Sequence, residues 1–153
     1  MHQCQQDWPL ADRDRDRFAG VVFWGGDRDR STERLQYGIN ARSAPAMKHP
    51  QCNTILESVK QYLQTLYGEQ LKAVILYGSQ AREDAHEFSD IDILVVLDTP
   101  INPYREIDRT SEFIAQLCLD NNVVISTHFI SSEKFQNANN PFLQNIRNEG
   151  ILV

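Results

Sequence analysis

Asp90 and Asp92 are separated by a single residue, Ile91, which begins the apolar run Ile91–Leu97 (IDILVVL). If this run is a β-strand, residues two apart point to the same side, so both carboxylates share a face while Ile91 and Ile93 point into the core. Adjacent carboxylates repel each other unless a cation neutralises them, and Mg²⁺ prefers one or two carboxylates together with substrate phosphates. The pair therefore indicates a magnesium site, although an Asp-x-Asp pattern alone is more often a solvated strand entrance.

Gly78 and Ser79 form a second feature with chemical potential, and they directly follow the apolar run Leu71–Tyr77. A glycine lets a ligand approach the backbone closely. A serine at the start of a helix adds a hydroxyl and an amide where unpaired N–H groups favour phosphate. No Lys-Ser or Lys-Thr pair follows, so this is not a Walker A loop. A Gly-Ser pair alone is usually just a turn, but here ten residues, 80–89, connect it to Asp90.

The elements that must position these residues are two strands, predicted over 71–77 and 91–97. A short helix is expected between them, over 80–85. Before the first strand, apolar residues at helical spacing predict a longer helix that has Asn53 as its N-cap and ends at Gly68.

The remainder of the chain continues the alternation of helices and strands. A helix is predicted over 104–119, followed by a third strand over 123–130. The buried stripe of that helix is expected to contain Ile107, Ser111, Ile114 and Cys118. Ser131 or Ser132 can cap the next helix, and a final helix is predicted over 141–148, ended by Gly150. This order indicates a small α/β (α+β) domain with a short mixed sheet packed by helices.

The charge of the chain is unevenly distributed. Residues 1–46 contain seven acids and seven arginines, so the whole net charge of −6 belongs to residues 47–153. An acidic body disfavours direct binding of nucleic acid, because few basic groups are present to replace counterions. No apolar run approaches the ~20 residues that a membrane-spanning helix needs, and no signal core is seen. We therefore expect a cytoplasmic protein with no membrane partner.

Residues 1–46 differ from the rest of the chain. Alternating Asp and Arg over 12–17 and 27–30 give no apolar face, so the composition favours disorder over a strand. A further hypothesis is that the natural protein starts at Met47, which is also the first residue of the domain expected over 47–153. The cysteines at positions 4, 52 and 118 form no Cys-x-x-Cys pair, so they indicate neither a disulfide framework nor a zinc site.

The combination of the two motifs resembles the nucleotidyltransferase superfamily of the DNA polymerase beta type. The closest resemblance is to its minimal, single-domain MNT branch, which typically reads Gly-Ser-x-Ala-Arg and then Ser-Asp-x-Asp followed by hydrophobic residues. The positions that match this pattern are Gly78, Ser79, Ala81, Arg82, Ser89, Asp90 and Asp92. The tail over 141–153 resembles the branch as well, and the whole resemblance covers about residues 53–153.

This resemblance implies a role for each motif residue. Gly78 and Ser79 would hold the triphosphate of ATP, and Asp90 and Asp92 would bind Mg²⁺ as the catalytic acids, with Ser79 beside them. Arg82 could contact phosphate or pair with the acidic strand, since arginine suits both.

The sequence departs from the family pattern at the third strand. Many members place a third carboxylate there, whereas 123–130 contains no acid. Ser126 and His128 share one face by alternation, and Ser126 is the expected occupant of the third position. His128 could act as a base, although an ordinary half-exposed histidine is the commoner case. His86, before Asp90, is expected at the surface.

For function, the resemblance implies an antitoxin. Members of this branch transfer AMP from ATP to a tyrosine hydroxyl of a partner HEPN-type RNase toxin, which inactivates the RNase. The missing third acid leaves open a catalytically weak module that neutralises its partner by binding alone. Transfer to a small-molecule hydroxyl is less favoured, because such enzymes usually carry an additional acceptor-binding domain.

Overall fold

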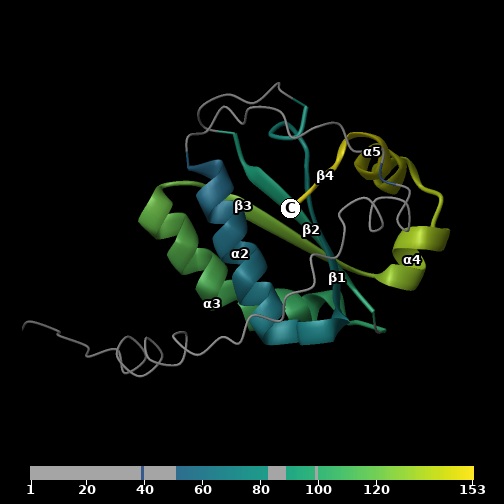
Figure 1. Cartoon of the computed structure of the whole chain (residues 1–153), viewed down its shortest axis with the longest axis horizontal. Coiled ribbons are helices and arrows are strands. Elements are labelled where there is room, and N and C mark those ends of the chain that lie inside the picture. Colours follow the sequence, from purple (N-terminus) through teal and green to yellow (C-terminus); the bar gives the residue numbers. More distant parts are fainter. Residues whose placement is uncertain (1–38, 40–50, 83–88, 99) are drawn as a thin grey trace, which may run out of the picture.

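The computed structural model describes residues 39, 51–82, 89–98 and 100–153. In chain order the elements are α2 (Cys52–Tyr67), the 3₁₀ turn η2 (Gly68–Gln70), β1 (Leu71–Tyr77), β2 (Ile91–Leu97), α3 (Pro103–Asn121), β3 (Ile125–Ser131), α4 (Ser132–Asn137), α5 (Pro141–Glu149) and β4 (Ile151–Leu152) (Figure 1). Apart from Ile39, the expected disorder of 1–46 and the start at Met47 lie outside the described residues, as do His86 and the second half of the helix expected over 80–85.

The four strands form one mixed sheet in the order β3-β2-β1-β4. β1 pairs antiparallel with both β2 and β4, whereas β2 and β3 run parallel. The predicted fold class, a short mixed sheet packed by helices, is therefore confirmed. The two central strands, β1 and β2, are the ones that carry the Gly-Ser and Asp-x-Asp motifs.

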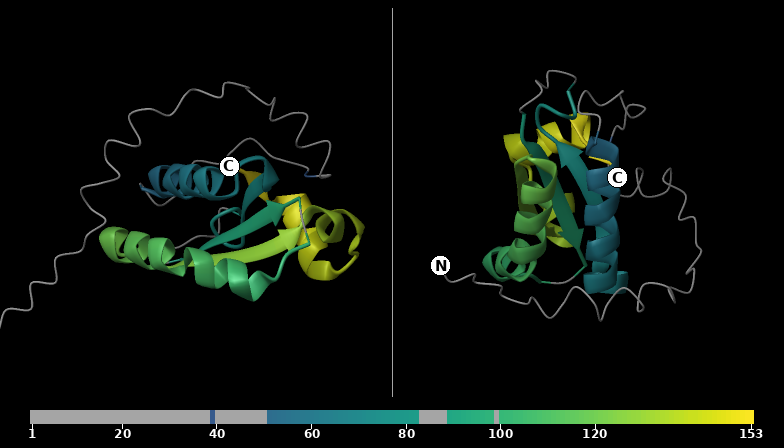
Figure 2. Two further views of the ribbon diagram at one scale, coloured as in Figure 1. Left: turned by 90° about the horizontal axis from the view of Figure 1, so that it is seen from below. Right: turned by 90° about the vertical axis from the view of Figure 1, so that its left-hand side faces the viewer.

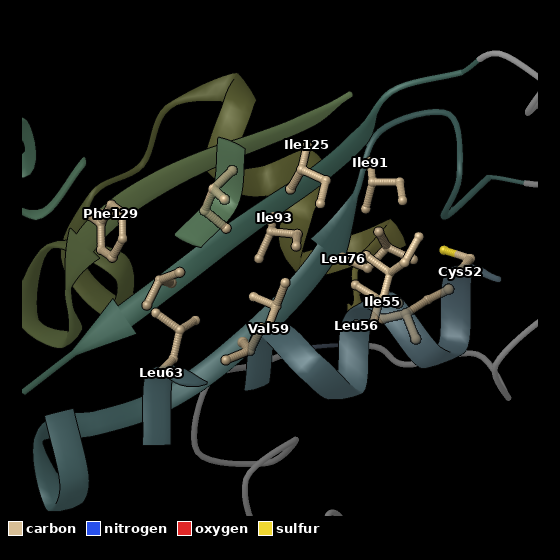
Figure 3. Close-up of a cluster of buried hydrophobic side chains, with 14 of the residues drawn as sticks. Cys52, Ile55, Leu56, Val59, Leu63, Leu76, Ile91, Ile93, Ile125 and Phe129 are labelled. Carbon is tan, nitrogen blue, oxygen red and sulfur yellow. The ribbon is translucent and has the colours of Figure 1, made fainter. Parts of the chain in front are cut away.

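Helices cover both faces of the sheet. Figures 1 and 2 show α2 and α3 on one side and α4 and α5 on the other. In Figure 3 the side chains of Val59 and Leu63 on α2 point at the sheet, where Ile93 lies. On the opposite face Leu94 is buried in the cluster that includes Phe135 of α4. β2 is thus apolar on both sides, and Asp92 is its one polar residue.

The two central strands have the predicted bounds, but the first helix begins earlier than expected. α2 begins at Cys52, and its N-cap, Gln51, makes no side-chain capping bond. Asn53 lies inside the helix and is not its cap. Cys52 is fully buried, so packing of the first turn explains the earlier start. The same burial raises the pKa of its thiol to about 11, which keeps it protonated at neutral pH.

The predicted stripe of α3 is wrong at two positions. Ile107 and Ser111 are exposed, whereas Thr110 and Ile114 are buried. Thr110 tolerates burial because its hydroxyl donates to the carbonyl of Glu106 at 2.9 Å. In the first half of the helix the buried position is therefore Thr110 instead of Ile107 and Ser111, whereas Ile114 and Cys118 pack against the core as expected.

The C-terminal elements follow the predicted order. β3 begins at Ile125, two residues later than expected. Ser131 caps α4 by accepting a hydrogen bond from the backbone of Lys134, as one of the two alternatives predicted. α5 ends at Gly150, and the two-residue strand β4, which was not predicted, follows it. None of the helices in the described part of the chain is long and apolar enough to cross a bilayer.

Candidate active site

Gly78 and Asp92 meet where β1 ends and β2 begins. The antiparallel register pairs Tyr77 with Asp92, so the next residue, Gly78, lies against the Asp92 carboxylate. A Cβ at Gly78 would overlap Oδ2 of Asp92 and stand 3.2 Å from its Cγ. Gly78 also has a φ of 77°, in the left-handed region that favours glycine. Both the contact and the backbone conformation therefore require glycine at this position.

Ser79 starts a tight turn at the end of β1. The backbone N–H of Ala81 donates to the carbonyl of Gly78, and that of Arg82 donates to the carbonyl of Ser79, each at 3.2 Å. These bonds span three residues, as in a 3₁₀ turn. The described part of the expected short helix is thus a turn, and it begins with the serine that the family pattern assigns to phosphate.

The two aspartates interact electrostatically. Asp90 is exposed just before β2, and Asp92 is half-buried within it. Burial and then the charge of Asp90 raise the pKa of Asp92 above its ordinary value, against smaller opposing effects from His128 and Arg82. Such a pair suits a divalent cation, because a cation offsets the repulsion from Asp90, which is the second cause of the raised pKa after burial.

The donor set fits magnesium better than a fully protein-ligated metal. Within the described residues, no group of three or more Asp, Glu, His and Cys side chains is placed to hold an ion. Mg²⁺ commonly takes one or two carboxylates and completes its shell with substrate phosphates and water. Asp90 and Asp92 would be the residues that hold it.

Ser126 lies beside the acid pair, on the strand where many family members carry a third carboxylate. The parallel register pairs Asp92 with Ser126 and Leu94 with His128. Both β3 residues therefore share the sheet face of Asp92, and Ser126 is the nearer of the two along the strand. Whether either residue takes part in catalysis stays a prediction.

Tyr77 and His128 lie on the same sheet face as Asp92, and the ring of Phe142 contacts both of them. The Tyr77 hydroxyl and Nδ1 of His128 are hydrogen-bonded at 2.8 Å. Phe142, at the start of α5, has its ring centroid 5.5 Å from that of Tyr77 and 6.1 Å from that of His128. Burial and the charge of Asp92 raise the pKa of Tyr77 to about 12, so the phenol remains protonated. Tyr77 and Phe142 were not predicted as site residues, because the pairing of Tyr77 with Asp92 depends on strand register and the position of Phe142 depends on the packing of α5.

Arg82 lies between the Gly-Ser turn and α5. Its Nη1 is 3.5 Å from Oε2 of Glu149, and both side chains are about half exposed. Its charge also lowers the pKa of Asp92, though less than burial and Asp90 raise it. The ion pair is thus with α5, while the interaction with the acidic strand acts at longer range. Contact of Arg82 with phosphate stays a prediction.

Gln80 was placed by sequence only in the short helix, but the structure gives it a connecting position. Its side chain is buried, and Nε2 donates to the carbonyl of Ser89 at 3.1 Å. Oε1 has no hydrogen-bond partner in the part of the chain that the structure describes. This bond ties the Gly-Ser turn to the residue just before Asp90. Its burial follows from tertiary packing, so the sequence carries no signal that would have identified this role.

Comparison with curated proteins finds relatives of this chain. Two proteins of Methanocaldococcus jannaschii, MJ1305 and MJ0604, are provisionally named protein adenylyltransferases. The first is 40% identical over 63 residues, which span 41% of this chain and 42% of that protein. The second is 35% identical over 101 residues, which span 63% of this chain and 95% of that protein.

Solved structures give more distant matches. A crystal structure of a toxin-antitoxin with AMP-PNP has 19% identity and a TM-score of 0.44, over 63% of this chain and 70% of that one. A provisionally named nucleotidyltransferase from Sulfolobus solfataricus has 17% identity and a TM-score of 0.44, over 86% of this chain and 90% of that one.

A family model matches the part of the chain that contains both motifs. The model described as "Polymerase beta, Nucleotidyltransferase" matches residues 57–153, which is more than half of the chain and includes both motifs. The M. jannaschii protein MJ0604 agrees, since it is matched over nearly its full length. The chain therefore belongs to the polymerase beta-like nucleotidyltransferase family.

Proposed function

We propose that this protein transfers AMP from ATP to a hydroxyl group of a partner protein. The observation that carries the proposal is the contact of Asp92 with Gly78, next to the charge of Asp90. A triphosphate held by the turn would lie beside a cation held by the acids. The names of the two M. jannaschii relatives support a protein as the acceptor.

In this proposal each motif residue has one task. Gly78 leaves room for the Asp92 carboxylate to lie against the turn, and Ser79 offers its hydroxyl and backbone N–H to the phosphate oxygens. Asp90 and Asp92 hold Mg²⁺. When bound, the cation neutralises the acid pair and stabilises negative charge on the α-phosphoryl group.

The transfer makes one bond and breaks one bond. The acceptor oxygen bonds to the α-phosphorus while the bond from that phosphorus to the bridging oxygen breaks. Pyrophosphate leaves with the electron pair, and the hydroxyl proton passes to solvent or to a nearby base. Because Asp92 lies on a central strand, its carboxylate is held in a fixed position for this in-line displacement.

The acceptor that we propose is a tyrosine of a HEPN-type RNase toxin, and AMP transfer would inactivate the RNase. This assignment rests on the resemblance of the motif region to the MNT branch. The partner is best sought in the gene that neighbours the one encoding this chain.

The test is incubation with ATP labelled at the α-phosphate, Mg²⁺ and the neighbouring gene product. We expect label on the partner, and loss of the label when its acceptor tyrosine is replaced by phenylalanine. Asp90→Asn and Asp92→Asn should each abolish transfer. Asp98→Asn is the matched control, because Asp98 follows the other end of β2 and pairs with Lys72. Transfer by Asp90→Asn and Asp92→Asn at the wild-type rate would contradict the proposal.

Ser126 supports a second candidate function. Because the residue beside Asp92 on β3 carries no carboxylate, the protein could neutralise its partner by binding alone. A pure binder would inhibit the partner without ATP and would still inhibit after Asp90→Asn. An enzyme would need ATP, and its effect on the partner would persist after the two proteins are separated.

A further inference from the structure

Tyr77, His128 and Phe142 form a ring cluster that the proposed reaction does not use. Each ring contacts the other two, with centroid separations of 6.1 Å between Tyr77 and His128, 5.5 Å between Tyr77 and Phe142, and 6.1 Å between His128 and Phe142. The hydrogen bond between Tyr77 and His128 holds two of the rings in a fixed orientation. The cluster is therefore a prearranged aromatic surface.

Packing alone does not account for this cluster. Phe142 is 46% exposed, and His128 is exposed as well. In a ring cluster that only filled the core, these side chains would be buried, as Phe135 is on the neighbouring helix α4. Aromatic ring surface that is ordered and still open to solvent is suited to a flat ligand.

The cluster also lies at the proposed nucleotide site. Tyr77 is the β1 partner of Asp92 and directly precedes Gly78. His128 is close enough that its charge affects the pKa of Asp92. The α-phosphate would lie beside the cation that Asp90 and Asp92 hold. Because only the ribose connects this phosphate to the base, the base must lie no farther from the acids than the length of one nucleoside. The aromatic surface is adjacent to that position, and its rings carry no negative charge.

We propose that the ring of Phe142, held in place by its contacts with Tyr77 and His128, binds the base of the nucleoside triphosphate by stacking. This inference rests on the proposed function and adds the position of the base to it. Stacking of a base on an aromatic side chain is tolerant of base identity, because every base has a π-face. The structure thus assigns a place to the base without assigning its identity.

The experiment compares two probes by isothermal titration in the presence of Mg²⁺: ATP and inorganic tripolyphosphate. Phe142→Ala should raise the Kd for ATP by about 5- to 150-fold, which corresponds to the loss of one stacking contact. Its Kd for tripolyphosphate should stay at the wild-type value. Phe142→Tyr should restore ATP binding, because it keeps the ring. Tyr104→Ala is the control, since Tyr104 is 83% exposed on the first turn of α3, which follows the far end of β2.

Three outcomes would overturn the inference. Unchanged ATP affinity in Phe142→Ala would do so, including the case in which only transfer to the acceptor slows, because the ring would then serve the acceptor. Equal weakening of ATP and tripolyphosphate would indicate a general structural effect. If the wild-type protein bound neither probe, the proposed function would fail and this inference with it. In the first two outcomes tripolyphosphate still binds to the wild-type protein, so the proposed function survives.

Discussion

At the scale of single residues, the site depends on the absence of a Cβ atom at Gly78. The Asp92 carboxylate occupies space that a side chain on Gly78 would need. Sequence reasoning placed Gly78 near phosphate and the two aspartates on one face, because strand periodicity is local information. The contact between glycine and aspartate could not be predicted in this way, because it depends on the register of two strands that are separated by a 13-residue connection, 78–90.

We predict that Gly78→Ala abolishes metal-dependent ATP binding. The new methyl group must displace the Asp92 carboxylate, and the positive φ adds about 1 kcal/mol of backbone strain. Gly68→Ala is the matched control, because Gly68 also has a positive φ but no atom lies within 4 Å of the position that its Cβ would take. Both variants should lose stability in urea unfolding, but only Gly78→Ala should lose binding in titration calorimetry. Equal binding by the two variants would contradict the prediction.

Asp92 should make stability depend on pH with an unusual sign. Its pKa is raised in the folded protein, so between the ordinary and the raised value the folded state binds more protons than the unfolded state. Stability contributed by this group is therefore present at low pH and lost as pH rises through that window. We expect Asp92→Asn to be more stable than wild type at neutral pH without Mg²⁺, as measured by urea unfolding.

Asp98 provides the control of opposite sign for that measurement. Hydrogen bonds from Lys72 and Ser132 lower its pKa, so its contribution is present at neutral pH and lost as pH falls. Asp98→Asn should therefore be no more stable than wild type at neutral pH. A stability of Asp92→Asn below that of wild type at neutral pH would show that burial and the charge of Asp90 do not destabilise the charged carboxylate.

At the scale of elements, strands that are apolar throughout were predictable and strands that depend on a partner were not. β1 and β2 have the predicted bounds because both contain long apolar runs. β3 begins two residues late, because Val124 is exposed and contributes only its carbonyl, which accepts from Ile91 at 2.8 Å. β4 has only two residues, which is too few to show the alternation of a strand in the sequence. It forms because Leu152 pairs with Ile75 of β1.

The junction of α5 with the sheet should be intolerant of added volume. A Cβ at Gly150 would overlap the carbonyl oxygen of Ile146 and stand 2.7 Å from Cγ2 of Ile75. Since the carbonyl is backbone that caps the end of α5, it cannot rotate away. We predict that Gly150→Ala destabilises the protein by about 1–3 kcal/mol in urea unfolding, as expected for overpacking. Stability equal to wild type would mean that α5 can shift freely on the sheet.

At the scale of the whole molecule, the candidate site is assembled from four separate segments. The end of β1, the start of β2, the start of β3 and the start of α5 contribute Gly78, Asp92, Ser126 and Phe142. The first three were predictable, because the family pattern and strand alternation specify them. The ring cluster was not, because the position of α5 over the sheet depends on tertiary packing that no local pattern encodes.

The placement of Asp92 on an interior strand has a consequence for how activity responds to heat. β2 is hydrogen-bonded on both sides, to β1 and to β3, and is apolar on both faces. Strands of this kind open only when the entire domain unfolds, unlike termini and surface loops, which fray at little cost. The position of Asp92 should thus persist up to the melting transition, and the capacity for transfer should disappear together with the native state.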